Sequence, residues 1–156
     1  MSRIYEIMFL IDNNAVRAGW KEAKASVTGL IEKHGGKVRA ARRWDERKLA
    51  YPIKRRRRGT YVLVYGELSG QGVATLRREL DLTENVLRYL LLQVEAVPPK
   101  EVELTQAELA SDFRVPEPPP EDVVDGAADE SQAEADEGEE LEEVAVSEGE
   151  LAEEEV

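Results

Sequence analysis

The stretch that decides the fold is "WDERKLAYPIKRRRRGTYVLVYGEL", Trp44–Leu68, in which two apolar segments flank a run of cations. From Leu49 to Lys54 large apolar residues alternate with others, which predicts a strand, and Pro52 places that strand at a sheet edge or a bulge. The β-branched and aromatic residues of Thr60 to Leu68 predict a second strand. The "RRRRG" between them predicts a hairpin loop, so the two strands are expected to pair antiparallel.

The hairpin is preceded by a predicted strand, helix and strand. Arg3 to Ile11 is rich in β-branched and aromatic residues, and its odd-numbered residues from Tyr5 onward form the cleaner core face. Apolar residues then recur at helical spacing from about Val16 to His34. Gly35-Gly36 supplies the left-handed residue that ends such a helix. Lys37 to about Arg47 predicts another strand, which a break near "WDE" separates from the first arm of the hairpin.

After the hairpin, the pattern predicts one more helix and one more strand. Ser69 can cap a helix over about Gln71 to Leu80. Val86 to Val94 is apolar almost throughout, as in a central strand that is covered on one face. The element order β-α-β-β-α-β predicts an α+β fold of the ferredoxin-like type, a four-stranded antiparallel sheet with two helices on one face. The opposite face of the sheet is expected to stay open and available for binding.

The chain joins a basic body to an acidic end. Residues 1–100 hold 20 Lys and Arg against 11 Asp and Glu, a net charge of +9, whereas residues 101–156 hold 1 against 22, a net charge of −21. The Pro-rich and then acidic composition cannot bury enough apolar area to offset the entropy of ordering. We therefore predict a folded domain over residues 1–97 and a disordered tail over 98–156, with at most a transient helix near Leu104 to Leu109.

The basic body carries little that could support catalysis. Its one histidine, His34, lies in the predicted last turn of a helix, where a cation meets the helix dipole favourably, so a structural role is the better interpretation. No nucleotide-binding glycine motif or P-loop occurs. Asp45-Glu46 and the Asp81/Glu84 pair lack the further spaced ligands that a metal site needs. We expect no enzyme activity, no cofactor and no metal.

The hairpin cations form a ridge of like charge, whose self-repulsion a polyanion would relieve. Arginine is suited to phosphate because its planar fork binds two oxygens at once. Trp44, Tyr51 and Tyr61 could stack on unpaired bases, although Trp44 and Tyr51 also fit half-buried sheet positions and the cations also fit a solvated loop. The predicted RNA-binding residues are Arg39, Arg42, Arg43, Arg47, Lys48, Tyr51, Lys54, Arg55, Arg56, Arg57 and Arg58.

Two interpretations of the acidic tail remain open. As a coil, residues 101–156 would span roughly 40 Å, which is enough to reach the hairpin and screen it until RNA displaces the tail. Alternatively, the tail aids solubility and makes no contact. The chain has no cysteine, which fits a reducing compartment, and its start shows no signal peptide or membrane-spanning run. We expect a cytoplasmic protein.

Four motifs carry a family resemblance: "YE" at Tyr5-Glu6, "GGKV" at Gly35 to Val38, "W…RKLAYPIK….G.Y" from Trp44 to Tyr61, and "EL…NVLRYLL" from Glu79 to Leu91. Together they resemble the bacterial small-subunit ribosomal protein S6 family over roughly residues 3–95. The resemblance implies a ferredoxin-like domain that binds the central domain of small-subunit (16S) ribosomal RNA. It also implies ribosomal protein S18 as a partner in assembling the platform of the small ribosomal subunit.

The same resemblance assigns roles within the hairpin and marks two departures. Arg47 and Tyr51 would be RNA contacts, and Leu49 and Ile53 would be structural. The chain has Asp45 where the family generally has glycine, followed by Glu46 where a basic or polar residue is common, so the backbone shape and the RNA approach there are open. We hypothesise that the four consecutive arginines compensate.

Two other functions fit the fold, because fold alone does not set function. One is a ligand-sensing or metal-carrying module, against which the missing cysteines and glycine-rich ligand loop argue. The other is a protein-interaction module that acts through a sheet edge or the acidic tail. Salt dependence separates RNA binding from protein interaction, since only phosphate neutralisation gives a steep dependence.

Overall fold

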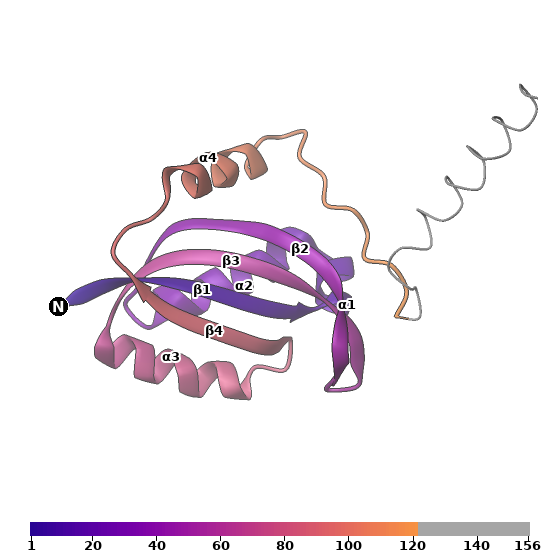
Figure 1. Cartoon of the computed structure of the whole chain (residues 1–156), viewed down its shortest axis with the longest axis horizontal. Helices are drawn as coiled ribbons and strands as arrows, with labels where there is room; N and C mark the ends of the chain where they lie inside the picture. The colour runs from indigo at the N-terminus through magenta and orange to yellow at the C-terminus, as the bar shows by residue number, and fades with distance from the viewer. Residues whose placement is uncertain (122–156) are drawn as a thin grey trace, which may run out of the picture. The chain divides into compact units, whose positions relative to one another are not determined.

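The computed structural model describes residues 1–121 and forms a four-stranded antiparallel sheet with helices packed on it (Figure 1). The strands, in the spatial order β2-β3-β1-β4, are β1 (Ser2–Asp12), β2 (Lys37–Ile53), β3 (Arg56–Ser69) and β4 (Val86–Val94). The helices are α1 (Asn13–Ala18), α2 (Trp20–Lys33), α3 (Gly70–Leu82) and α4 (Pro99–Glu108).

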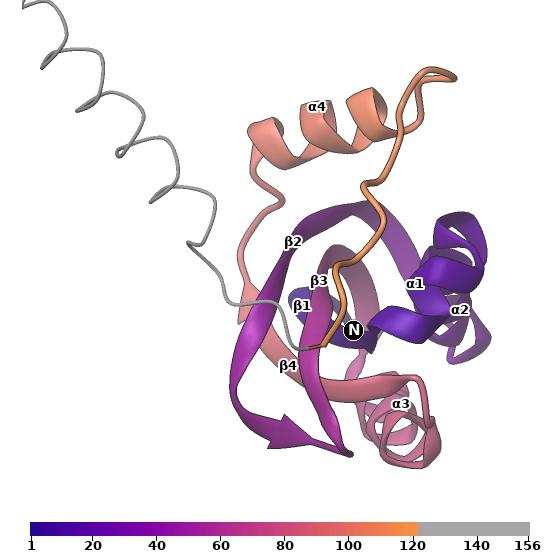
Figure 2. The same ribbon diagram turned by 90° about the vertical axis from the view of Figure 1, so that its right-hand side faces the viewer.

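The predicted ferredoxin-like arrangement is confirmed. Helices α2 and α3 connect the strands in the expected order and lie on one face of the sheet (Figure 2). The core between these helices and the sheet buries Ile7, Phe9 and Ile11 almost completely, so the odd-numbered face of β1 is the core face as predicted. Leu76 and Leu80 of α3 are buried against it.

The first predicted helix is two helices, because the backbone is extended at Gly19 (φ 170°, ψ 120°) between α1 and α2. The end of α2 follows the prediction. Gly35 takes a left-handed conformation (φ 77°), its N–H donates to the Glu32 carbonyl at 3.0 Å, and the Gly36 N–H donates to the Ile31 carbonyl at 2.9 Å. These two bonds satisfy carbonyl groups that the helix end would otherwise leave without partners.

The turn of the β2–β3 hairpin is tighter than predicted. Its central residues are Lys54 and Arg55, with φ of 47° and 66°, and Ile53 pairs with Arg56. Positive φ at both central positions is what a type I′ turn requires, and that turn matches the twist of the flanking strands. The predicted "RRRRG" loop is therefore wrong, because Arg56 to Arg58 extend the ladder of β3 instead.

Strand β2 is continuous where two pieces were predicted. The expected break near "WDE" is a bulge: the register with β3 shifts between Arg43 and Asp45, which leaves Trp44 as an extra residue. A further shift lies between Lys48 and Ile53, a stretch that contains a proline, which cannot donate to the ladder. Bulges bend a strand and increase its twist, so both features direct the path of the hairpin.

The predicted central position of β4 is wrong. Within residues 1–121 this strand pairs only with β1 and forms an edge of the sheet, which leaves Leu90 and Leu92 exposed by 56% and 48%. The helix-free face is also less open than expected. Leu63 and Tyr65 are buried there, and Val97, from the segment that follows β4, packs against them.

Helix α4 packs along the outer edge of β2 (Figure 2). The Ala41 N–H donates to Thr105 Oγ1 at 3.2 Å, and the Arg43 N–H donates to Glu108 Oε2 at 2.7 Å. At most a transient helix was expected here, so this expectation is wrong. The prediction of disorder rested on the low apolar content of this segment. Helix α4 is instead held by polar side chains that accept hydrogen bonds from the backbone of an edge strand.

The compact unit that contains the sheet runs from Met1 to Asp122. Whether residues 1–97 fold independently, with 98–156 as a tail, stays a prediction. The acidic segment from residue 122 onward, and any screening of the hairpin by it, lies outside the described residues.

Candidate nucleic-acid interface

The exposed cations of the hairpin lie toward its turn. Pairing between β1 and β3 ends at Asp12 and Gly59, so the hairpin continues past β1 (Figure 1). Two antiparallel arms then bring charges from both strands together. The exposed cations of this projecting part are Arg47, Lys48, Lys54, Arg55 and Arg57.

Arg56 and Lys54 connect the projecting part to the body. Arg56 is half-buried, and its Nε donates to Asp12 Oδ2 at 2.9 Å. The Lys54 Nζ donates to the Val86 carbonyl at 3.1 Å. Both contacts hold the turn end of the hairpin against neighbouring parts of the domain, which limits how far its charges can move.

The predicted cations farther from the turn either form ion pairs with glutamates or are half-buried. Arg39 pairs with Glu67 of β3 at 2.6 Å. Arg42 binds Glu101 of α4 through Nε and, at 2.9 Å, through Nη2, and only 15% of its side chain is exposed. Arg43 is half-buried, and its Nε has no hydrogen-bond partner among the described residues. The structure does not gather these three residues with the cations near the turn.

Arg58 is buried, with 2% of its surface exposed, in spite of its place in the arginine run. Its Nε and Nη2 donate to the two oxygens of Glu46 at 2.8 and 3.0 Å. Asn13 also donates to Glu46 Oε1 at 3.0 Å, and Thr60 donates to Asn13 Oδ1 at 2.8 Å. This network ties β2, β3 and α1 together. Arg58 therefore has a structural role and does not belong to the exposed set.

Both acidic departures have arginine partners, Glu46 within this network and Asp45 outside it. The Glu46 side chain is only 7% exposed and serves as a counter-ion of Arg58. Asp45 accepts from Arg47 Nε at 2.6 Å, and this hydrogen bond lowers the pKa of the Asp45 carboxyl below its ordinary value. The pairing of Glu46 with an arginine twelve positions later has no sequence signal, since it needs the strand register.

Aromatic residues lie beside the exposed cations. The Arg47 guanidinium lies 5.0 Å from the centroid of the Trp44 ring, and Trp44 meets Tyr61 edge-to-face at 5.7 Å. Trp44 is 42% exposed and Tyr51 is 61% exposed, so both offer ring surface to a ligand. Ile53 is buried against Leu10 and Leu87, which supports its structural assignment.

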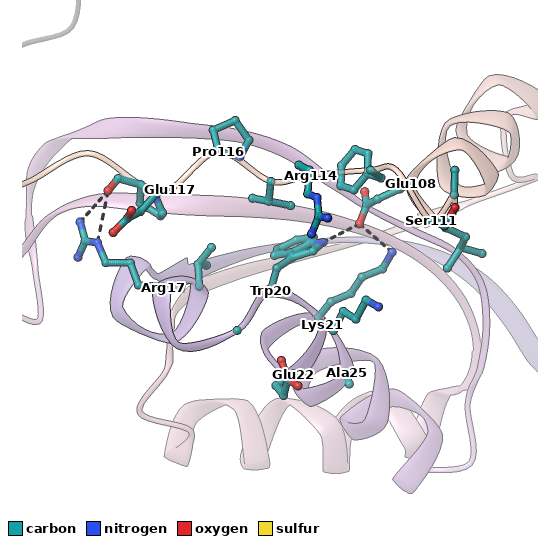
Figure 3. A pocket seen from close by; sticks show the side chains of 18 of the residues that line it. Arg17, Trp20, Lys21, Glu22, Ala25, Glu108, Ser111, Arg114, Pro116 and Glu117 are labelled. Atoms are coloured by element: carbon teal, nitrogen blue, oxygen red, sulfur yellow. Dashed lines mark hydrogen bonds and ion pairs between the residues drawn. The ribbon is translucent and has the colours of Figure 1, made fainter.

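Glu108 was not predicted to have a role. It accepts from Trp20 Nε1 at 3.1 Å and from Lys24 Nζ at 2.8 Å in addition to the Arg43 N–H, and its side chain is 5% exposed (Figure 3). These bonds join α4 to α2 as well as to β2. A sequence signal was present: Glu101, Thr105 and Glu108 are spaced four and three apart, which places them on one face of a helix.

Docking of α4 is expected to weaken at acidic pH. The hydrogen bond from Arg42 lowers the pKa of Glu101. A carboxyl with a lowered folded-state pKa stabilises docking fully above its unfolded value of about 4.3, and the contribution is lost as pH falls through the lowered value. The fluorescence of Trp20, in a W44F variant, would report the transition because Trp20 bonds to α4. In an R42M variant the midpoint should move to higher pH; an unmoved midpoint would contradict this assignment.

His34 has the structural position predicted for it. It ends α2, and its Nε2 pairs with Glu79 of α3, which Lys33 also contacts at 2.5 Å. Hydrogen bonds from Lys33 and His34 lower the pKa of Glu79. Within residues 1–121, no three His, Asp or Glu side chains gather as metal ligands would. None of the helices in this part is long and apolar enough to cross a membrane.

The fold and the hairpin define a small ferredoxin-like domain with a projecting basic hairpin. The model of the family described as "Ribosomal protein S6" matches residues 4–93. The chain belongs to the ribosomal protein S6 family, a family of the small ribosomal subunit. The match ends within β4, so α4 and the residues after it lie beyond it.

Individual relatives agree with this assignment. Small ribosomal subunit protein bS6 of Fusobacterium nucleatum is 35% identical over 91 residues, 58% of this chain and 97% of the relative. The bS6 protein of Granulibacter bethesdensis is 30% identical over 119 residues, 74% of this chain and 77% of the relative. The crystal structure of 30S ribosomal protein S6 from Thermotoga maritima is similar, with a TM-score of 0.53 and 29% identity over 60% of this chain and 89% of that one.

Proposed function

We propose that this chain is a structural constituent of the small ribosomal subunit that binds the central domain of small-subunit (16S) ribosomal RNA together with ribosomal protein S18. Its place would be in platform assembly and translation, on cytoplasmic ribosomes. The observation that carries the proposal is the concentration of exposed cations from both hairpin arms at the projecting end. The residues proposed to contact RNA there are Arg47, Lys48, Tyr51, Lys54, Arg55, Arg56 and Arg57.

The chemistry of this end suits an irregular RNA better than a free anion. Phosphates along an RNA strand present charge repeatedly, and a ribbon with cations on both arms can neutralise several of them together. The exposed ring of Tyr51, with Trp44 nearby, can stack on bases that are not paired. Arg39, Arg42 and Arg43, which lie farther along β2, are proposed only as secondary contacts, since acids or burial already engage them.

The proposal is tested by the salt dependence of binding to a transcript of the central domain. If about five phosphates are neutralised, log K should fall with log salt with a slope of roughly −4. The transcript should bind more tightly when ribosomal protein S18 is added. A slope near zero, with and without that partner, would overturn RNA binding. Cosedimentation of the chain with small subunits in a sucrose gradient would test the assembly itself.

One observation favours a second function, a protein-interaction surface. The β4 edge exposes Leu90 and Leu92, and an edge strand can accept a partner strand. Such an interaction would depend weakly on salt, so the same titration distinguishes it. The absence of a catalytic activity and of a cofactor stays a prediction.

A further inference from the structure

The segment after α4 returns to the base of the hairpin. It runs from Leu109 to Glu121 and passes α1 and α2 on its way to β3 (Figure 2). Arg17 of α1 anchors it, because Nη2 donates to the Pro118 carbonyl at 3.1 Å and to the Pro119 carbonyl at 2.7 Å. These two hydrogen bonds hold the backbone of the segment in place just before it reaches the hairpin.

Glu121, the last residue that the structure describes, accepts hydrogen bonds from two successive backbone amides. Glu121 Oε2 accepts from the Arg57 N–H at 2.5 Å and from the Arg58 N–H at 3.1 Å. These amides lie just before Gly59, where pairing of β3 with β1 begins, and the Glu121 carboxylate accepts from both of them. Successive N–H groups that point at one oxygen favour a negatively charged ligand, and the surrounding arginines add to the attraction.

The carboxylate satisfies this position only in part. Glu121 Oε1 is buried and has no hydrogen-bond partner among the described residues. A buried acceptor without a partner weakens the contact as a whole. An anion that satisfies all of its acceptors could therefore replace Glu121 at these amides. RNA, the ligand proposed for the hairpin, carries phosphates along its backbone.

We propose that the N–H groups of Arg57 and Arg58 form a phosphate-binding site for the RNA backbone, and that Glu121 occupies this site in the absence of RNA. The inference rests on the proposed function, since it assigns a contact within the same interface. Glu121 competes intramolecularly, at the high effective concentration that a short tether provides. RNA binding then includes displacement of the segment that Arg17 anchors.

Removing the competitor should tighten RNA binding. In the full chain, E121A is expected to bind a central-domain transcript about three- to tenfold more tightly at low salt, because a backbone phosphate can then accept from the two amides without displacing a carboxylate. The matched control is E117A, which removes the same charge from an exposed position on the same segment. Its affinity should stay within about twofold of the parent chain, because it frees no phosphate site.

A second variant separates displacement from net charge. R17M removes a cation, which alone would weaken RNA binding, but it also removes the anchor at the Pro118 and Pro119 carbonyls. Tighter binding by R17M supports the inference, and weaker binding counts against it. Amide hydrogen exchange at Arg57 and Arg58 should accelerate in E121A and slow again when the transcript is added.

The failure of this inference can be told from failure of the proposed function. If the parent chain binds with a steep salt slope but E121A equals E117A, the phosphate site is wrong and RNA binding stands. If neither the parent chain nor any variant binds the transcript, the proposed function and the phosphate site are both wrong.

Discussion

The E46A variant is expected to lose about 3–5 kcal/mol of unfolding free energy, because it removes the carboxylate that the buried Arg58 guanidinium binds through two hydrogen bonds. Arg58 is 2% exposed and donates hydrogen bonds to both carboxylate oxygens of Glu46. The same substitution also leaves the Asn13 amide without its acceptor. Urea denaturation followed by circular dichroism would measure the loss, which is a large fraction of the roughly 5–15 kcal/mol total stability of a typical domain.

A pair of further variants separates charge from hydrogen bonding. R58M alone should destabilise by several kcal/mol, because Glu46 stays buried and charged. The double variant E46Q/R58M removes both charges, and the glutamine can still accept from Asn13, so most of the lost stability should return. If the double variant is no more stable than R58M, burial of the charge is not the cause.

The triple variant K54A/R55A/R57A is expected to weaken binding to the central-domain transcript by about 100-fold or more near 0.1 M salt, with a slope shallower by about 2–3. The three substitutions lie at the exposed end of the hairpin and leave the buried Arg58 in place. The unfolding free energy should change little, since exposed charges contribute little to stability. Filter binding over a salt series would measure both the affinity and the slope.

The matched control is K21A/R77A/R78A, which removes the same three charges from exposed positions on α2 and α3. These positions lie on helices, away from the hairpin, so affinity should change by less than about threefold through the weaker overall field. Equal losses in the two triple variants would mean that net charge, rather than the hairpin, determines binding.

Much of the fold could be predicted, because its main signals are local. Alternation along β1 identified the buried face, and the glycine pair after His34 identified the end of α2. The turn could not be placed from composition, since a lysine and an arginine with positive φ are unusual where Asn-Gly is expected. The predicted central position of β4 was wrong for a related reason. An apolar sequence predicts a central strand whether or not a second strand pairs beside it.

The candidate site was predicted less completely, because it depends on which charges find partners. A run of arginines looks uniform in a sequence, but the pairing of β2 with β3 buries Arg58 against Glu46 and leaves Arg57 exposed. The engagement of Arg42 by Glu101 requires α4, which apolar content did not suggest. The spacing of polar residues on one face of α4, rather than an apolar pattern, indicates where this helix docks.

Helix α4 has a consequence for how copies of this chain can associate. Thr105 and Glu108 already accept hydrogen bonds from β2 amides. Among residues 1–121, the β2 edge of the sheet is therefore capped by α4, whereas the β4 edge is uncovered. Two molecules could add their β4 strands to each other, but a third could not join in the same way while β2 stays capped. Self-association through backbone pairing would therefore stop at a dimer and could not propagate into an open chain of molecules.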